Sequence, residues 1–267
     1  MMLPTLHGAA AIRNHQSAKI SRATTPQRHN VSPRCQPGTR QRVDFSNSIT
    51  ATRTGQSMAR QLPAHLTYKT ALALLPPAGV TPPIEAVRHV HDKNYRRWPP
   101  HINLIYPFLA SPLETSDSNS PRLSQAIRAR IEKATSGIRA FHVSLNADPP
   151  GNFTHSKTSK TVWLGPCPDA TVKQLQAALQ TEFTECDSDQ RAFTPHLSVG
   201  QAKTNKVAEQ LSKEVTNAIA GFCQDQEDND KTLDRFIDRV YVIERKGFHD
   251  RFTIVGSVDL AQEQHAS

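Results

Sequence analysis

The sequence contains one short pattern twice, and in each copy a histidine stands two positions before a small polar residue. PHINL at residues 100–104 is matched by PHLSV at residues 195–199, so both copies read proline, histidine, apolar, polar, apolar. Successive side chains of a β-strand alternate between its faces, so each histidine would share a face with the polar residue that follows it, Asn103 or Ser198. Because proline is tolerated at the first residue of a strand, both histidines are expected near strand beginnings, where a cleft can open.

Two histidines placed in this way suit acid and base catalysis on a phosphate ester. Cleaving a phosphodiester requires one group that takes a proton from the attacking oxygen and another that gives a proton to the leaving oxygen. Histidine can do either near neutral pH because its usual pKa is about 6.5. His101 and His196 are therefore the candidate catalytic residues, and Asn103 and Ser198 could donate hydrogen bonds to the phosphate oxygens. The near symmetry of the two motifs leaves open which histidine is the acid and which is the base.

A purely structural role explains this pair less well than it explains the other histidines. A single histidine followed two positions later by a polar residue is close to chance, and His89, His91 and His142 are expected on the surface or as satisfied core residues. Two copies with matching flanks, each at the start of an expected strand, are much less expected by chance. The repeated motif therefore favours a functional role for His101 and His196 over a structural one.

Weaker candidates for substrate binding lie near the motifs. Trp98 and Tyr106 could stack on a base, and Arg97 or Lys203 could meet a phosphate. Aromatic residues that flank a strand more often belong to a core, so a packing role competes with each aromatic assignment.

The sequence indicates neither a metal site nor a cofactor. No cluster of His, Asp and Glu appears at ligand spacing on either motif strand, which argues against a metal-dependent hydrolase. The four cysteines have no C-x-x-C pair, so we expect buried free thiols rather than a zinc site or a disulfide framework. They are Cys35, Cys167, Cys186 and Cys223.

The positive charge of the chain is concentrated in its N-terminal segment. Residues 1–60 contain nine Arg and Lys and a single acid, Asp44, whereas residues 61–267 hold 23 bases and 23 acids. The formal net charge of +8 therefore belongs to the first segment. That segment is rich in Arg, Ser, Thr, Gln and Pro and has no apolar period, so we expect residues 1–62 to form a disordered basic extension.

The hydrophobic content and the N-terminal composition bear on the cellular setting. Hydrophobic residues make up 37% of the 267 residues, which is enough to bury a core. No apolar run is long enough to span a bilayer, and a compact secretory signal is missing. We expect a monomer with no membrane partner, in the cytoplasm or nucleus, although an Arg- and Ser-rich, acid-poor N-terminus also fits a mitochondrial transit peptide.

The pattern from Leu66 onward alternates between strand-like runs and helical periods, which predicts a mixed α/β domain over residues 63–262 and a short C-terminal tail at 263–267. Strands are expected at 67–75, 102–109, 139–146, 161–165, 196–202, 236–245 and 251–260. Helices are expected at 82–93, 121–135, 169–183 and 205–222. Their apolar faces include Val90 in the first helix and Val207 in the last, and Asp169 is a candidate N-cap of the third.

The segment 66–262 resembles the two-histidine phosphoesterase superfamily, which includes 2′-5′ RNA ligases and cyclic nucleotide phosphodiesterases. The stretches that carry the resemblance are RRWPPHINLIYPF at 96–108, FTPHLSVGQ at 193–201 and VYVIERKGFHDRFTIVGSVDL at 240–260, and they are similar to fungal members in particular. The resemblance implies an α+β, bilobal fold in which two pseudo-symmetric lobes of antiparallel sheet, with helices on the outside, surround a central cleft.

The resemblance also implies an activity and its residues. It implies a metal-independent 2′,3′-cyclic phosphodiesterase or a related activity on RNA ends or nucleotides, with His101 and His196 as the acid/base pair and Ser198 as a phosphate ligand. Asn103 departs from the family pattern, in which Thr or Ser follows the first histidine by two. An amide NH2 can still donate to phosphate, but it lacks the hydroxyl's ability to accept. A catalytically weak RNA- or nucleotide-binding module is therefore the alternative function.

Overall fold

The structure is a computed structural model that describes residues 62–115, 121–187, 192–225 and 233–262. The expected basic extension at 1–62, apart from Leu62 itself, and the expected tail at 263–267 lie outside the described residues. Leu62 packs against the main hydrophobic core, so ordered packing extends to the first described residue.

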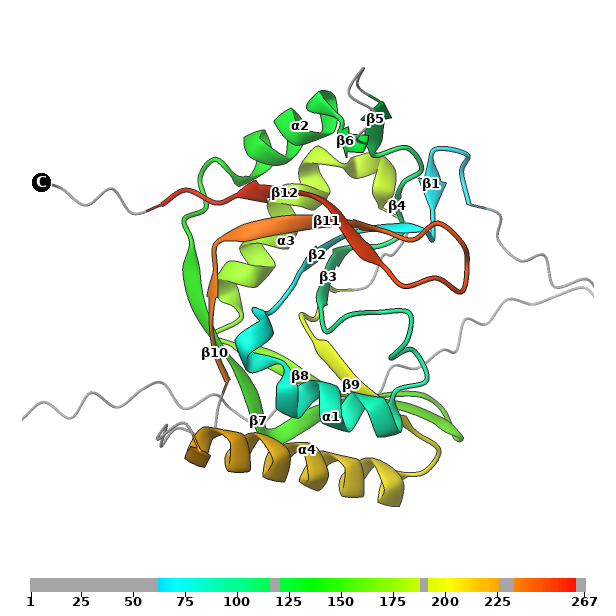
Figure 1. Cartoon of the computed structure of the whole chain (residues 1–267), viewed down its shortest axis with the longest axis vertical. Helices are drawn as coiled ribbons and strands as arrows, with labels where there is room; N and C mark the ends of the chain where they lie inside the picture. The colour runs from blue at the N-terminus through cyan, green and yellow to red at the C-terminus, as the bar shows by residue number, and fades with distance from the viewer. Residues whose placement is uncertain (1–61, 116–120, 188–191, 226–232, 263–267) are drawn as a thin grey trace, which may run out of the picture. The chain divides into compact units, whose positions relative to one another are not determined.

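The first of two four-stranded antiparallel sheets carries the first histidine motif at its edge (Figure 1). Its order is β12-β11-β2-β3, with β12 at Thr253–Asp259, β11 at Arg239–Glu244, β2 at Thr70–Leu74 and β3 at Ile102–Ile105. Ala73 on β2 lies opposite Asn103 on one side and Tyr241 on the other. Cross-strand partners point to the same face, so these three residues share a face of the sheet.

The second sheet carries the second motif, also on an edge strand. Its order is β10-β7-β8-β9, with β10 at Leu233–Ile237, β7 at Phe141–Ser156, β8 at Ser159–Cys167 and β9 at Leu197–Ala202. Buried and half-buried residues alternate along β8, as expected for a strand with one covered face. Trp163 on the half-open face of β8 lies opposite Ser198 on β9.

In the described part of the chain four helices cover the two sheets, and two of them are exchanged between the lobes (Figure 1). The helix α1, Pro82–His91, stands between β2 and β3 in the chain but packs against β9 and α4, which spans Asn205–Asp225. The helix α3, Ala170–Glu182, stands between β8 and β9 but packs against β3 and α2, which spans Gln125–Thr135. Each histidine strand is therefore covered by a helix that precedes the other histidine strand.

The smaller elements lie at the ends of these layers. β1 at Leu66–Thr67 pairs with β4 at Phe108–Leu109, and β5 at Leu113–Thr115 pairs with β6 at Pro121–Leu123. Two 3-10 turns, η1 at Ala78–Val80 and η2 at Thr184–Cys186, complete the described elements.

The apolar side chains form one large core and one small cluster. The large core joins both lobes, because it contains residues of both sheets and all four helices, such as Leu72, Leu164 and Leu175. The small cluster consists of Ala71, Ala73, Ile243 and Phe252, with Leu75, Trp98, Tyr106 and Tyr241 packed around it. Since Ala73 shares a face with Asn103, this cluster lies on the motif-bearing face of the first sheet.

The structure confirms the α+β class and the two-lobed arrangement, and it corrects several expected faces and boundaries. Val90 of α1 is 70% exposed and Val207 of α4 is 43% exposed, so neither belongs to the buried face predicted for its helix. Arg88 takes a buried position on α1 instead. Asp169 does occupy the N-cap position of α3, but its side chain makes no capping hydrogen bond and pairs with Lys173 at 2.7 Å.

The expected strands and helices also changed length. The strand expected at 102–109 is divided into β3 and β4 around the cis peptide bond between Tyr106 and Pro107. Residues 121–123 of the helix expected at 121–135 form β6, and the strand expected at 236–245 is divided into β10 and β11. Of the strand expected at 139–146, residues 141–146 form the first part of β7, which has 16 residues.

Candidate active site

The two histidines have the same backbone hydrogen bond, although they lie on different sheets. Nδ1 of His101 lies 2.7 Å from the carbonyl oxygen of Pro99, and Nδ1 of His196 lies 2.8 Å from the carbonyl oxygen of Thr194. A carbonyl only accepts, so each Nδ1 carries the proton and each neutral ring has Nε2 as its acceptor. Among the described residues no group bonds to either Nε2. Both rings are thus held from behind with one nitrogen left for a substrate.

The strand beginnings bring the two rings into electrostatic range of each other. His101 immediately precedes β3 and His196 immediately precedes β9, and these two strands contact each other. A positive charge on His196 contributes to lowering the pKa of His101. The motifs on the two lobes are therefore brought to one site.

Aromatic rings support each histidine. Trp98 stacks on His101 with ring centroids 4.4 Å apart and planes at 15°, and its other neighbour Phe252 lies 3.8 Å away. On the second lobe, the ring of Phe153 meets His196 edge-on at 4.9 Å, and Trp163 lies 6.0 Å from it. These contacts limit the freedom of both imidazoles and shield one side of each from water.

Burial keeps both imidazoles neutral. Desolvation lowers the pKa of His101 to about 4, with further lowering by the charges of Arg88 and His196, while the Pro99 carbonyl acts in the opposite direction. Desolvation also lowers the pKa of His196, and the charge of His155 lowers that pKa further. The neutral form is the one that can accept a proton from an attacking oxygen, so at neutral pH the site favours a base.

The polar residues of the two motifs lie on the same faces as their histidines. Asn103 and Ser198 are both half-buried, and each follows its histidine by two positions in an edge strand. The amide oxygen of Asn103 is buried without a hydrogen-bond partner. Because the oxygen is the enclosed end of this amide, the NH2 group is the end left for a ligand, as donation to a phosphate would require.

A buried ion pair beneath the first motif was not predicted from the sequence. Arg88 and Asp92 pair at 2.7 Å with both side chains 2% exposed. Arg88 also donates to the backbone oxygen of Trp98 at 3.0 Å, and Asp92 accepts from the side-chain amide of Gln201 on β9 at 3.1 Å. The pair thus connects α1, the segment before His101 and the second histidine strand. The sequence signal that could have predicted this pair is an Arg and an Asp four positions apart, with the Arg at a core position of a helix.

The structure brings some of the remaining predicted residues to the histidines. Trp98 is in direct contact with His101, and Tyr106 meets Trp98 edge-on at 5.2 Å while its hydroxyl donates to the backbone oxygen of Tyr68. Lys203 is exposed just beyond the end of β9, seven residues from His196, or about 20 Å along an extended strand. Lys203 therefore lies beyond the opposite end of β9 from His196.

Metal ligands, cysteines and long apolar helices would each indicate another kind of site or setting. Within them no group of three or more His, Cys, Asp or Glu is arranged to hold a metal ion. Cys186 and Cys223 are buried and form no disulfide, as expected, but Cys167 is disulfide-bonded, which corrects that expectation. None of the helices in the described ranges has both the length and the apolar character needed to cross a bilayer.

A pair of imidazoles from two antiparallel sheets, with free Nε2 atoms and polar neighbours on the same faces, is an arrangement that can move protons to and from a phosphodiester. The comparisons agree. Residues 75–247 match the family model of the 2′-5′ RNA ligase superfamily. A Staphylococcus aureus (strain Newman) protein named as a candidate phosphoesterase is 26% identical over 171 residues, which cover 62% of this chain and 89% of that protein.

Two of the solved structures to which this chain is similar are complexes with a nucleotide. Escherichia coli LigT complexed with 3′-AMP has a TM-score of 0.45 and 16% identity, over 73% of this chain and 99% of that one. Kluyveromyces marxianus Usb1 with uridine monophosphate has a TM-score of 0.34 and 11% identity, over 73% of this chain and 98% of that one. On the family match, the chain belongs to the 2′-5′ RNA ligase superfamily and is an enzyme that acts on phosphodiester bonds.

Proposed function

We propose that this enzyme is a metal-independent phosphodiesterase of RNA ends or cyclic nucleotides, in which His101 and His196 form the acid/base pair. The observation that carries the proposal is the matched hydrogen bonding of the two rings. Each Nδ1 is bound to a backbone carbonyl, at 2.7 Å and 2.8 Å, and each Nε2 is left for substrate.

The proposed hydrolysis of a 2′,3′-cyclic phosphate needs only these two groups and water. The neutral imidazole takes a proton from water as the water oxygen bonds to phosphorus. The protonated imidazole gives its proton to the ribose oxygen as that phosphorus–oxygen bond breaks, which yields a phosphate monoester and a free hydroxyl. Asn103 and Ser198 would donate to the non-bridging oxygens, where negative charge builds up. If the 5′-hydroxyl of a second RNA end attacks the phosphorus in place of water, the same two proton transfers would join the two ends as the ribose oxygen leaves.

The test is turnover of 2′,3′-cyclic nucleotides and linear 2′-5′ dinucleotides by the full-length protein, with and without EDTA. We expect turnover to survive exhaustive chelation, because the proposed mechanism uses imidazoles rather than a metal-bound hydroxide. Activity that disappears in EDTA and returns with zinc or manganese would rule out this mechanism.

A second candidate function is a nucleotide-binding module with little turnover, which is favoured by Asn103. An amide replaces the hydroxyl of the family pattern, and its oxygen is buried without a partner. Measuring binding of a nucleoside 3′-phosphate beside turnover separates the two candidates, because the module predicts binding without product.

We further propose that the enzyme acts as a monomer in the cytoplasm or nucleus. The Arg- and Ser-rich composition of residues 1–60 supports the mitochondrion as the alternative compartment. Imaging the full-length chain with a C-terminal fluorescent tag distinguishes these compartments.

A further inference from the structure

Two loops beside His101 carry much more positive charge than the rest of the domain. The loops are residues 92–98, before the first motif, and residues 245–252, between β11 and β12. Together they hold six bases and two acids, whereas residues 61–267 are formally neutral. Of the two acids, Asp92 is already paired with the buried Arg88. The excess positive charge is therefore local to this region.

Hydrogen bonds tie the two loops to each other. The backbone N–H of Phe252 donates to the carbonyl of Arg97 at 2.8 Å, and the guanidinium of Arg251 donates to the carbonyl of Tyr95 at 3.1 Å. The loops meet at Trp98, whose ring stacks on Phe252 at 3.8 Å and on His101 at 4.4 Å. The ring of Trp98 therefore lies between the charged surface of these loops and His101, the proposed catalytic base or acid.

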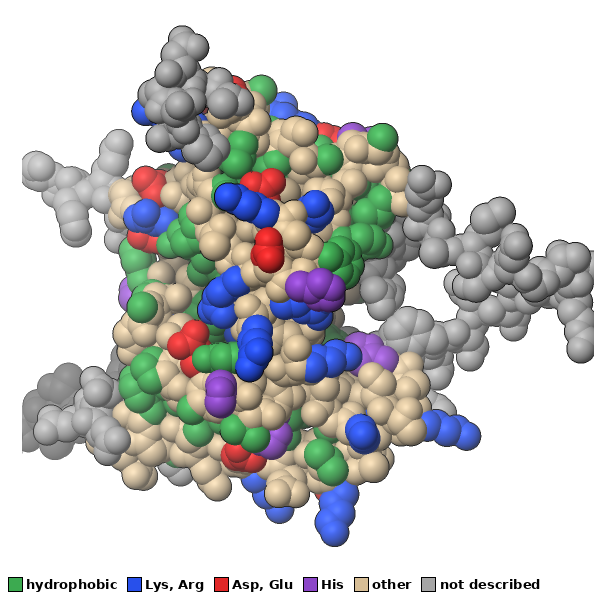
Figure 2. All heavy atoms as spheres, turned by 45° about the vertical axis from the view of Figure 1, so that its right-hand side comes forward, with side chains coloured by type: hydrophobic (Ala, Val, Ile, Leu, Met, Phe, Trp, Pro, Cys, Tyr) green, Lys and Arg blue, Asp and Glu red, His purple; other side chains and the backbone are tan. Residues whose placement is uncertain are grey.

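Four of the six Lys and Arg residues in these loops are available to a partner. Lys93, Arg96, Lys246 and Arg251 are exposed, and within the described ranges none of them pairs with a carboxylate. We call these four residues the basic rim. Figure 2 shows Lys and Arg side chains gathered on the face that contains the two loops. The remaining acid, Asp250, accepts from the backbone N–H of Gly247 at 2.7 Å.

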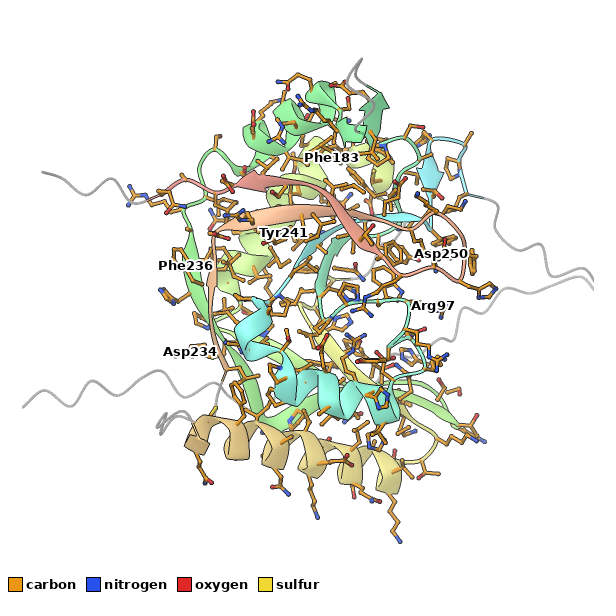
Figure 3. All side chains as sticks on the ribbon, in the orientation of Figure 1. Arg97, Phe183, Asp234, Phe236, Tyr241 and Asp250 are labelled. Carbon is orange, nitrogen blue, oxygen red and sulfur yellow. The ribbon has the colours of Figure 1, made fainter. Side chains whose placement is uncertain are left out.

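The rim also presents an aromatic ring to solvent. Phe248 of the second loop is 57% exposed, and the buried Arg245 supports its ring from beneath, with the guanidinium carbon 4.5 Å from the ring centre. Arg245 is itself held by the carbonyls of Phe248 and Tyr68. Figure 3 labels Arg97 and Asp250, one on each loop, on the same side of the molecule. Exposed Lys and Arg side chains beside an exposed aromatic ring suit a single-stranded nucleic acid. Its phosphates can contact the positive charges, and its unpaired nucleobases can stack on the ring.

We propose that the basic rim binds the phosphate backbone of a single-stranded RNA that continues from the bond cleaved between His101 and His196. This inference rests on the proposed function and extends it, because it adds a binding surface outside the two histidine motifs for the strand that leads to the cleaved bond. Exposed Lys and Arg side chains contact phosphates without reading bases, so the rim selects for length and charge rather than for sequence.

The experiment compares two charge-matched double variants of the full-length chain. Arg96→Gln with Lys246→Gln removes one base from each loop, and Lys206→Gln with Lys213→Gln removes two exposed bases from α4. Each variant is assayed on a 2′,3′-cyclic mononucleotide and on an RNA hexanucleotide that ends in a 2′,3′-cyclic phosphate. The affinity of a fluorescent hexanucleotide with a 3′-phosphate is measured by anisotropy over a range of salt concentrations.

We expect the rim variant to lose about tenfold in kcat/KM on the hexanucleotide and none on the mononucleotide, while the α4 variant changes neither. For the rim variant, the slope of log K against log salt should become shallower by about 1.4, which is about 0.7 for each of two lost phosphate contacts. Equal behaviour of the two variants on the hexanucleotide would overturn the proposal, as would a loss on the mononucleotide as large as that on the hexanucleotide.

Two further outcomes are separated by design. A parent protein with no turnover on either substrate would contradict the proposed function, but the anisotropy measurement would still decide whether the rim binds RNA. Polyglutamate serves as a second polyanion. If it bound as tightly as the hexanucleotide at equal charge and lost the same affinity in the rim variant, an acidic protein would replace RNA as the partner.

Discussion

The half-site of His101 and the half-site of His196 are alike in the backbone and different in their surroundings. Both rings donate from Nδ1 to a carbonyl two residues earlier, and both are backed by a tryptophan. The ring of His101 lies in a full stack with Trp98 and above a buried ion pair, whereas His196 has only an edge-on contact with Phe153 and a looser approach to Trp163.

This difference indicates how two nearly identical motifs can take different roles. The ring of His101 has its pKa lowered to about 4, and it is the ring whose positively charged neighbours include Arg88. A group that stays neutral over a wide pH range is suited to be the base, and its partner is then left to act as the acid. We therefore expect His101 to be the base and His196 the acid during hydrolysis.

The largest expected effect comes from removing either ring. His101→Ala and His196→Ala should each lower kcat on a 2′,3′-cyclic nucleotide by about 10²–10⁴-fold, because each removes general acid or base assistance. His142→Ala, which removes an exposed histidine of β7, is the matched control and should leave kcat unchanged. Near-full activity in either variant would make that histidine a structural residue and end the comparison of two half-sites.

A second effect should come from the polar residue in which the two half-sites differ. Asn103→Ala should lower kcat by about 10–10³-fold, because it removes a donor to the phosphate in the transition state. Asn103→Thr should stay within about tenfold of the parent, because the Thr hydroxyl can donate in place of the amide. Single-turnover rates and nucleotide affinity of the three proteins give the measurement. If Asn103→Ala matches the parent in both, Asn103 lies outside the phosphate site, and if only Asn103→Thr is active, the parent is the binding module.

The pH dependence of kcat/KM tests the assignment of base and acid. Activity requires neutral His101, hence a pH above about 4, and protonated His196, hence a pH below a pKa that is itself lowered from 6.5. The optimum should therefore lie between about 4 and 6.5. In the residual activities, His101→Ala should lose the acid limb and His196→Ala the alkaline limb. Exchanged limbs would reverse the roles.

Protein stability should report the same burial of His101. Its pKa is about 4 in the folded chain against the usual 6.5, so between these pH values the unfolded chain binds a proton that the folded chain does not. The free energy of unfolding should therefore fall as the pH is lowered through this window. Urea unfolding of the parent and of His101→Gln at several pH values measures it. A variant with the same pH dependence as the parent would show that His101 is not the buried group responsible.

The smallest effect is expected outside both half-sites. Removing residues 1–60 should leave kcat on a mononucleotide unchanged, because this segment has no apolar pattern with which to pack on the domain. The change should appear in cellular localisation and in the salt dependence of binding to long RNA, since nine bases are lost. A folded but inactive truncated protein would contradict this prediction.

The sequence determined the parts of this protein that depend on local pattern. The repeated PHINL and PHLSV segments located both histidine strands, because alternation along a strand places a histidine and the residue two positions on at one face. The apolar period located α3, whose inward residues Val172, Leu175 and Leu179 are fully buried. The charge count separated a basic N-terminal segment from a neutral remainder.

Only the tertiary structure decided what depends on contacts between distant segments. The exchange of α1 and α3 between the lobes has no local signal, because each helix is amphipathic whichever sheet it covers. Arg88 is buried because Asp92 and the Trp98 carbonyl compensate its charge, and helical periodicity assigned the exposed Val90 to the buried face instead. The lowered pKa of His101 likewise depends on burial by residues from several elements, and burial of this kind is a property of the packed chain rather than of the motif.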